Sequence, residues 1–142
     1  MELRDEKGLT EREFLAAYRQ KSYPHPYLTA DVVLLSNDMD RVLLIRRKGH
    51  PCLGKWAMPG GFVNPDESAF EAALRELCEE TGVTGLSRDA ITEIGLFSEP
   101  GRDPRGWVVT SAYLAIIRKE AAAISAGDDA ASAMWFLPVS DY

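Results

Sequence analysis

Apolar residues recur along this chain at two different spacings, which predict one long helix set among several strands. Between residues 64 and 82, Phe70, Ala73, Leu74 and Leu77 recur every three or four residues, a spacing that gives a helix one apolar face. Runs rich in β-branched and aromatic residues predict strands at 28–35, 41–45, 91–97, 107–117 and 133–137. Strands before and after one long helix indicate an α+β fold built on a mixed β-sheet.

A second, shorter helix is predicted near the N-terminus. Thr10 and Glu13 have the spacing of a capping box, and the apolar residues that follow predict a helix to about Gln20. Pro24 and Pro26 then favour an extended connector. At 142 residues the chain has the length of one domain. We therefore expect a single domain over 1–142, with 1–24 as an N-terminal helical extension.

Capping residues mark both ends of the long helix. Asn64 is a candidate N-cap, Pro65 suits the first helical position, and Glu67 can reach back as in a capping box. Gly82 is suited to the left-handed conformation that ends many helices. These residues predict a helix that begins near 65 and ends at 81.

Three carboxylates are crowded into the last turn of this helix. Glu76, Glu79 and Glu80 lie on one side of it and repel one another, at the end where the helix dipole is already negative. Such a conflict is expected where a cation binds, because a divalent metal turns repulsion into coordination. Arg75 is four residues from both Glu71 and Glu79 and can hold a carboxylate in one orientation.

The window from Gly61 to Val83 resembles the Nudix box, G-x5-E-x7-R-E-U-x-E-E-x-G-U with U aliphatic. All nine specified positions are matched, and Pro59-Gly60-Gly61 leads into the motif. The resemblance implies an α/β/α sandwich that hydrolyses a phosphoanhydride with Mg²⁺ or Mn²⁺. Oxygen ligands, which are the only ones that converge at this helix end, also favour these two ions over zinc.

The resemblance also implies roles for individual residues. Glu76 and Glu80 correspond to the principal metal ligands, and Glu79 with the carbonyl of Gly60 or Gly61 would complete the site. Either Glu79 or Glu76 would lie near the attacking water, and the residues alone do not separate these two roles. Glycines at 60 and 61 would let the backbone approach the metal and the phosphates closely.

Family members often supply a further acidic residue from a loop before the final strand. Asp128 and Asp129 occupy the corresponding region, and we take Asp129 as a catalytic candidate. A solvated turn is an equally good interpretation of this Gly- and Asp-containing stretch. Trp56 could stack on a base, but its apolar neighbours favour a place in the core.

Positive charge for the substrate is available at two places. Arg46 and Arg47 follow the second predicted strand, and Arg102 and Arg105 lie in the polar loop Gly101-Arg-Asp-Pro-Arg-Gly106. Arginine can hold phosphate with two parallel hydrogen bonds, although charged loops are often simply solvated. This loop, together with the stretch 54–61, resembles the Nudix branch that contains ADP-ribose pyrophosphatases. A small nucleoside diphosphate derivative, with ADP-ribose as the leading candidate, is therefore the expected substrate.

Two alternatives to this function remain open from the sequence. One is MutT-like removal of oxidised nucleoside triphosphates. The other is a sensor or regulator domain that binds an ADP-ribose-like metabolite, as in related regulators that bind DNA through an added winged helix. A length of 142 residues leaves no room for that winged helix, and a sensor would not need the carboxylates. The net charge of −6 also argues against a general nucleic-acid binder.

Composition indicates a cytoplasmic protein without a membrane partner. The first residues lack the apolar stretch of a signal peptide, and no run approaches the length that spans a bilayer. Cys52 and Cys78 are too few for a disulfide framework, and we expect both to be small packing residues.

The C-terminal end predicts an exposed sheet face. Family members commonly continue past the strand at 133–137 into a helix, whereas this sequence stops at Tyr142. We expect the helix at 10–20 and a partner subunit to cover that face, because soluble monomers rarely expose large apolar patches. The result would be a homodimer. A shortened version of a longer chain is the alternative.

Overall fold

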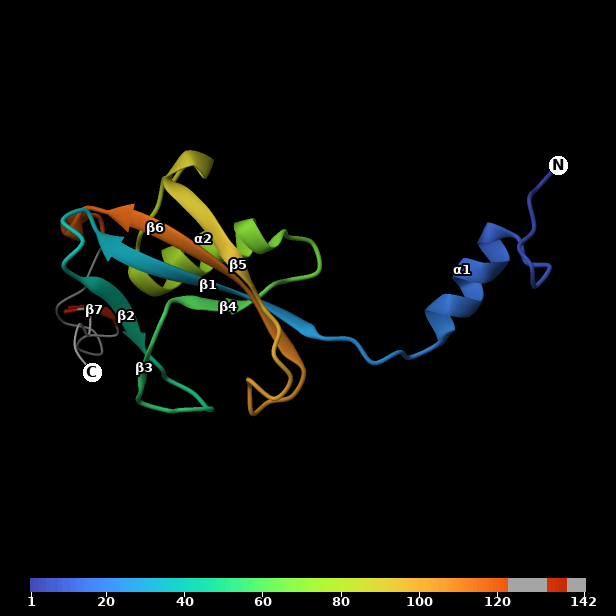
Figure 1. The fold of residues 1–142 in the computed structure, drawn as a ribbon, viewed down its shortest axis with the longest axis horizontal. Coiled ribbons are helices and arrows are strands. Elements are labelled where there is room, and N and C mark those ends of the chain that lie inside the picture. Colours follow the sequence, from blue (N-terminus) through green and yellow to red (C-terminus); the bar gives the residue numbers. More distant parts are fainter. Residues whose placement is uncertain (123–132, 138–142) are drawn as a thin grey trace.

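A mixed β-sheet forms the centre of the protein (Figure 1). The structure is a computed structural model that describes residues 1–122 and 133–137. Two parallel strands, β1 (Tyr27–Ser36) and β6 (Val108–Ile117), lie side by side at the centre. The neighbouring strands β2 (Val42–Arg46) and β5 (Ile91–Phe97) are antiparallel to them. The mixed sheet confirms the α+β prediction.

Three short strands complete the sheet. β3 (Trp56–Ala57) and β7 (Ala133–Phe136) both pair with β2, and β4 (Gly60–Phe62) pairs with β1. Two 3₁₀ turns, η1 (Arg88–Ala90) and η2 (Lys119–Ala121), flank the strands. All five predicted strands are present, with ends within one residue of the prediction. β3 and β4 were not predicted, because two or three residues are too short to show a period.

Helix α2 (Ala69–Thr81) packs on one face of the sheet. Its residues Ala73 and Leu77 belong to the same core cluster as Ala30, Val32 and Leu34 of β1. Strand side chains alternate between faces, so Thr29, Asp31 and Val33 point to the opposite side. The sheet therefore has one apolar face under α2 and one face that carries polar residues.

The start of α2 differs from the prediction. Its N-cap is Ser68, whose Oγ accepts a hydrogen bond from the Glu71 N–H at 3.1 Å, and Asn64 is not the cap. Residues 64–67 instead form a turn in which the Asn64 N–H donates to the Glu67 carboxylate at 2.9 Å. Glu67 also binds Arg75, and this second contact links the loop to the helix. The predicted end at Gly82 is confirmed, with a left-handed φ of 74°.

Helix α1 (Glu11–Gln20) forms as predicted but stands away from the sheet (Figure 1). Both hydrogen bonds of the Thr10–Glu13 capping box are present, at 3.2 and 3.0 Å. None of the ten helical residues is buried. The expectation that this helix covers a face of the sheet is therefore wrong for the chain by itself, because the extended segment 21–26 carries it outward.

Two smaller predictions have opposite outcomes. Cys52 and Cys78 are both exposed, so neither is a packing residue. Cys78 lies on the solvent side of α2, where its apolar character was a poor guide to burial. Trp56 is half-buried and packs edge-on against Phe136 with ring centroids 4.8 Å apart, which agrees with a packing role, although Trp56 is not part of the buried core cluster. Within the described part of the chain, no helix is both long enough and apolar enough to cross a membrane.

Candidate active site

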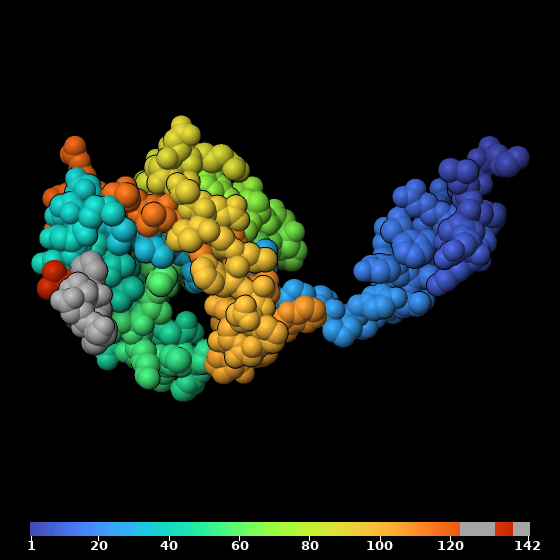
Figure 2. Space-filling model, in the orientation of Figure 1, coloured from blue at the N-terminus to red at the C-terminus, as the bar shows by residue number. Residues whose placement is uncertain are grey.

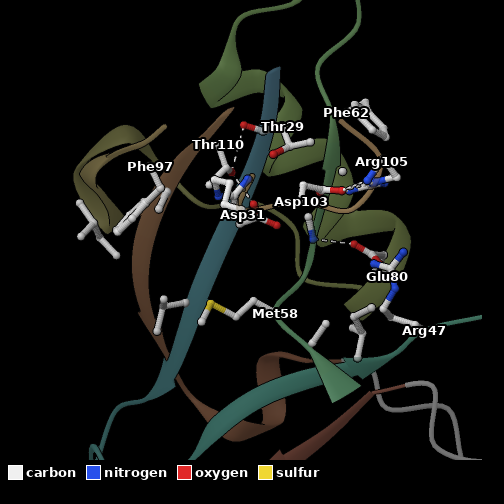
Figure 3. Close-up of a pocket in the computed structure, with 18 residues that line it drawn as sticks. Thr29, Asp31, Arg47, Met58, Phe62, Glu80, Phe97, Asp103, Arg105 and Thr110 are labelled. Carbon is white, nitrogen blue, oxygen red and sulfur yellow. Dashed lines mark hydrogen bonds and ion pairs between the residues drawn. The ribbon is translucent and has the colours of Figure 1, made fainter. Parts of the chain in front are cut away.

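A hollow of about 600 Å³ opens on the polar face of the sheet. Figure 2 shows it between the segment around β3 and β4 and the segment of β5 and the following loop. Its floor consists of side chains from β1 and β6, and the end of α2 reaches it past β4 (Figure 3). The lining includes the following charged residues: Asp31, Arg47, Glu80, Arg102, Asp103 and Arg105. Its volume lies within the range of small-molecule sites.

Arg75 ties the loop before α2 to the helix itself. Its Nη2 lies 2.7 Å from Glu67 Oε1 and donates to the Phe62 carbonyl at 3.0 Å. Its Nη1 lies 2.7 Å from Glu76 Oε1 and 3.5 Å from Glu79. The Arg75 hydrogen bonds hold the pKa of Glu67 below its usual value, and Glu67 and Glu76 together raise the pKa of Arg75. Arg75 therefore fixes the orientation of Glu76, and its partner in the loop is Glu67, outside the helix.

The repulsion among carboxylates that the sequence predicted acts on Glu80. Its Oε1 accepts a hydrogen bond from the Gly60 N–H at 2.8 Å. Burial raises the pKa of Glu80 to about 7, and the negative charges of Glu76, Asp31 and Glu79 act in the same direction. The Gly60 hydrogen bond opposes this shift only in part. Ionised Glu80 is therefore unfavourable here without further positive charge.

Gly60 and Gly61 allow carboxylates to approach the backbone. A Cβ at Gly61 would lie 2.3 Å from Glu76 Oε1, and a Cβ at Gly60 would lie 2.3 Å from Asp31 Oδ1. No side chain fits at such distances. The two glycines thus let the carboxylates of Glu76 and Asp31 lie directly against the backbone of β4.

These residues fit a hard divalent cation by their chemistry. Every candidate donor is an oxygen, and the crowding around Glu80 is the repulsion that a cation relieves. In the arrangement described, no three acidic, His or Cys side chains within residues 1–122 and 133–137 are gathered closely enough to hold an ion. Glu76 is turned to Arg75, and the Glu79 side chain is 57% exposed. Ion binding would therefore require side-chain rotation of these glutamates.

The two arginines at the end of β2 differ in whether they line the main hollow. Arg47 lines the main hollow, and its Nε donates to the Pro51 carbonyl at 2.6 Å. Arg46 donates to the Gly54 carbonyl at 3.2 Å and lines a neighbouring hollow together with Glu79 and Glu80. Arg47 is therefore the better placed of the two to meet a ligand in the main hollow.

Arg102 and Arg105 both line the main hollow, as the sequence suggested (Figure 3 labels Arg105). Arg105 binds both carboxylate oxygens of Asp103, at 3.0 and 2.7 Å, and its guanidinium lies 4.7 Å from the centre of the Phe62 ring. The Arg105 hydrogen bonds lower the pKa of Asp103 to about 2. Arg102 donates to the Val108 carbonyl at 3.2 Å. Both guanidinium groups keep further N–H donors that can bind an anion.

Asp31 is a site residue that the sequence reasoning missed. It lies in the middle of β1, projects into the hollow, and accepts a hydrogen bond from the Thr110 hydroxyl. Burial raises the pKa of Asp31 above its ordinary value. The signal was available, because Asp31 is the single charged residue in the apolar run 28–35. The other acidic candidate, Asp129, lies outside the described residues.

Comparison with known proteins connects this site to a family. The NUDIX domain family matches residues 25–142. An ADPR responsive transcriptional repressor of Acinetobacter baylyi is 39% identical over 116 residues, which are 79% of this chain and 45% of the repressor. An ADP-ribose pyrophosphatase of Methanocaldococcus jannaschii is 37% identical over 131 residues, 92% of this chain and 72% of that enzyme. The match thus spans less than half of the repressor.

A solved structure extends the likeness to the fold. The NUDIX domain of Shewanella oneidensis NrtR, in complex with ADP ribose, is 36% identical, with a TM-score of 0.74 over 91% of this chain and 84% of that domain. The complete Nudix box lies at the junction of β4 and α2 and borders the hollow. On the family match and these likenesses, the chain belongs to the NUDIX domain family.

Proposed function

We propose that this protein is a Mg²⁺-dependent hydrolase that cleaves the pyrophosphate bond of a nucleoside diphosphate linked to another group, with ADP-ribose as the leading substrate. The observation that carries the proposal is the position of Glu80. It lies in a nucleotide-sized hollow that Arg102 and Arg105 also line, and it is crowded by other carboxylates. The pyrophosphatase relative and the ADP-ribose complex support this choice of substrate.

In this proposal the metal is held by Glu76, Glu79 and Glu80 with the carbonyl of Gly60 or Gly61. Mn²⁺ would serve as well as Mg²⁺, since both prefer oxygen ligands. When bound, the ion supplies positive charge that neutralises the diphosphate oxygens and polarises the phosphorus atom under attack.

The side chains around the hollow would bind the diphosphate and accept a proton from the attacking water. Arg102, Arg105 and Arg47 bind the diphosphate, and Arg46 is a weaker candidate because it lies outside the main hollow. Arg75 holds Glu76 at 2.7 Å but lies 3.5 Å from Glu79. Glu79 is therefore freer to accept a proton from water, and we assign it as the general base. Asp129 stays a candidate for the same role.

The reaction then follows from these positions. Water loses a proton to Glu79 and attacks one phosphorus atom, and the bond from that phosphorus to the bridging oxygen breaks. The second phosphate leaves with the bridging oxygen. For ADP-ribose the products are AMP and ribose 5-phosphate.

A sensor that binds an ADP-ribose-like metabolite is the second candidate, because one relative is an ADPR responsive repressor. The complete set of Glu76, Glu79 and Glu80 favours the hydrolase, since binding alone does not require a site so crowded with negative charge. MutT-like cleavage of oxidised nucleoside triphosphates is the third reading, and it uses the same carboxylates.

A substrate panel separates these three functions. Purified protein is incubated with ADP-ribose, other nucleoside diphosphate derivatives and oxidised dGTP, each with Mg²⁺ and with a chelator. We expect Mg²⁺-dependent turnover of ADP-ribose. Turnover of oxidised dGTP alone would indicate pool cleaning, and saturable binding without turnover of any compound would indicate a sensor.

We also propose that the protein is a homodimer, with residues 1–24 as an arm outside the NUDIX domain. The arm presents Phe14, Leu15 and Tyr18, which are 46%, 38% and 51% exposed. A second copy would cover them, and two-fold dimers are the commonest assembly. Light scattering at micromolar concentration should give twice 15.7 kDa. A Phe14→Ser, Tyr18→Ser double variant should shift towards the monomer, and a monomeric wild type would refute the proposal.

A further inference from the structure

Asp31 occupies a position in β1 where a carboxylate lowers stability. Its neighbours Ala30 and Val32 are fully buried, and Asp31 itself is largely shielded from solvent on the opposite face. Placing an ionised group there costs free energy unless it is well paired. Its hydrogen-bond partners are neutral hydroxyls, those of Thr110 and Thr29, and Arg102 and Arg105 interact with Asp31 only at longer range.

The sheet does not need this carboxylate to hold together. β1 and β6 pair along their whole lengths through the backbone, with Thr29 opposite Thr110 and Asp31 opposite Ala112. An apolar side chain at position 31 would satisfy the same pairing at lower cost. The Asp31 side chain also requires a glycine at position 60, since a Cβ there would lie 2.3 Å from Asp31 Oδ1. Two positions therefore depart from local stability rules to keep one carboxylate in the hollow.

The charge of Asp31 limits what it can bind. A carboxylate accepts hydrogen bonds and repels phosphate, so its partner in a nucleoside diphosphate derivative must be a donor: a sugar hydroxyl or a base N–H. The position of Asp31 beside Gly60 favours the sugar hydroxyl over the base N–H. Gly60 lies opposite Asp31 in the pairing of β1 with β4 and donates its N–H to Glu80 at 2.8 Å, so a single residue separates Asp31 from the proposed reaction centre.

The sugar is the part of such a substrate that lies next to the diphosphate, and the base lies one ring further away. A carboxylate that binds ribose hydroxyls is also a known solution in dinucleotide sites. Figure 3 shows Asp31 with Thr29 and Thr110 on the floor, and Asp103 and Arg105 at the neighbouring wall. A sugar over the floor would leave the linked phosphates within reach of Arg105.

We propose that Asp31 is a specificity residue that binds the vicinal hydroxyls of a ribose attached to the diphosphate. This inference rests on the proposed function, because it takes a nucleoside diphosphate derivative as the ligand. The ribose can be that of the nucleoside or that of the second group, and both present the same pair of hydroxyls. Asp31 is thereby separate in role from the glutamates of α2.

Binding of the four product-like ligands tests this assignment without turnover. Calorimetry with Mg²⁺ compares AMP with 2′,3′-dideoxy-AMP, and ribose 5-phosphate with 2-deoxyribose 5-phosphate. For one of the two pairs, the wild type should prefer the hydroxylated ligand by about 10- to 100-fold, the value of hydrogen bonds to a charged group. The pair that shows the preference identifies which ribose lies over Asp31.

Two variants at position 31 and one control complete the experiment. Asp31→Ala should reduce the preference to about twofold or less, and the isosteric Asp31→Asn should reduce it about fivefold or more, since an amide is a weaker acceptor. Asp103→Asn removes another carboxylate from the same hollow, where it pairs with Arg105. It should change the affinity for both members of a pair equally and leave the preference intact.

Several results would overturn the assignment. A wild type that binds all four ligands without preference would do so, as would a preference that survives in Asp31→Ala. Equal weakening of both members of a pair by Asp31→Asn would show a structural role, and a loss of Mg²⁺ affinity without nucleotide would show a metal ligand. Failure of the wild type to bind any of the four or ADP-ribose would instead refute the proposed function itself.

Discussion

Helices α1 and α2 are both amphipathic and both begin with a hydroxyl side chain that caps the first turn, yet only α2 packs on the sheet. α2 buries Ala72, Ala73, Leu77 and Thr81, whereas α1 buries none of its residues. The apolar residues of α1 face solvent, with Tyr18 stacked on Tyr23 at 5.3 Å. A periodic apolar pattern thus predicts that a helix has a partner and does not say which partner it has.

The charged sides of the two helices differ in the same way. On α1, Glu13 serves the cap and lies 3.4 Å from exposed Arg4. On α2, the Glu76 carboxylate lies close to Gly61 of β4, and Glu80 accepts a hydrogen bond from the Gly60 N–H. Because α2 packs on the sheet, the carboxylates at its acidic end lie next to the β4 backbone and the hollow. The same acidic residues on an unpacked helix would form no binding site.

Loss of one α2 carboxylate should have the largest effect on activity. Glu80→Gln keeps the shape of the side chain and the acceptor for the Gly60 N–H but removes the charge. We expect the kcat for ADP-ribose with Mg²⁺ to fall by about 1,000-fold or more, at least what one transition-state contact contributes. Glu71→Gln, an exposed glutamate in the first turn of α2, is the matched control and should change kcat less than about twofold. Similar losses in both variants would place the chemistry elsewhere.

Substitution of one leucine on each helix tests how much the packing of that helix contributes to stability. Leu77 on α2 is 1% exposed and Leu15 on α1 is 38% exposed. Leu77→Ala should lower the free energy of unfolding by about 3 kcal/mol, as large-to-small changes in a core do. Leu15→Ala should change it by less than about 1 kcal/mol at a concentration where the protein is monomeric. Chemical denaturation measures both, and equal losses would mean that α1 packs on the domain in solution.

The loop arginines should act on the substrate and leave the metal unaffected. Arg105→Ala should lower kcat/KM for ADP-ribose about tenfold, because it removes a bidentate phosphate donor, with the Mg²⁺ dependence unchanged. Arg88→Ala is the control, since Arg88 stacks on Phe70 at 4.4 Å and does not line the hollow. Unaltered kinetics in Arg105→Ala would remove that residue from the substrate site.

The smallest expected effect is on stability without metal. The pKa of Glu80 rises from 4.5 to about 7 on folding, so its ionisation opposes folding. Stability should therefore fall as the pH rises from about 4.5 to 7, because the folded state holds the extra proton in that window. Above pH 7, Glu80→Gln should be more stable than the wild type by on the order of 1 kcal/mol, or about 3 °C in Tm.

Below pH 4.5 this advantage should vanish, since the wild-type carboxyl is then protonated in both states. Melting curves with a chelator at pH 8 and pH 4 compare the two proteins. Glu71→Gln should show no such dependence on pH. A variant that is less stable than the wild type at pH 8 would mean that charged Glu80 supports the fold.

The elements that repeat a period could be predicted, and those fixed by single contacts could not. Strands such as 91–97 and the α1 cap follow from local pattern and hydrogen bonding, so sequence and structure agree. The start of α2 was misplaced because Ser68 caps the helix four residues after Asn64. The predicted hydrogen bond from the Asn64 N–H back to Glu67 is nevertheless present, at 2.9 Å. β4 was missed because three residues show no period.

The site shows the same division. The glutamates were predicted because they crowd one turn of a helix, and Gly60-Gly61 because they lead into the Nudix box. Asp31 was missed because it reaches the site only through the pairing of β1 with β4 and β6. Its charge within an apolar strand was the one local signal. Consecutive side chains of an extended segment point to opposite faces, and the sequence does not show which face meets the hollow, so it could not separate Arg47 from Arg46.

Phosphorus NMR of ADP-ribose mixed with the protein and Mg²⁺ shows whether the protein cleaves the diphosphate. If the α2 carboxylates form a hydrolytic site, the diphosphate signals will disappear at a catalytic protein concentration and those of AMP and ribose 5-phosphate will replace them in equal amounts. A chelator will stop the conversion, and Glu80→Gln will leave the diphosphate intact. Diphosphate signals that persist with wild-type protein and Mg²⁺, while ADP-ribose binds saturably, would contradict the account and identify a sensor.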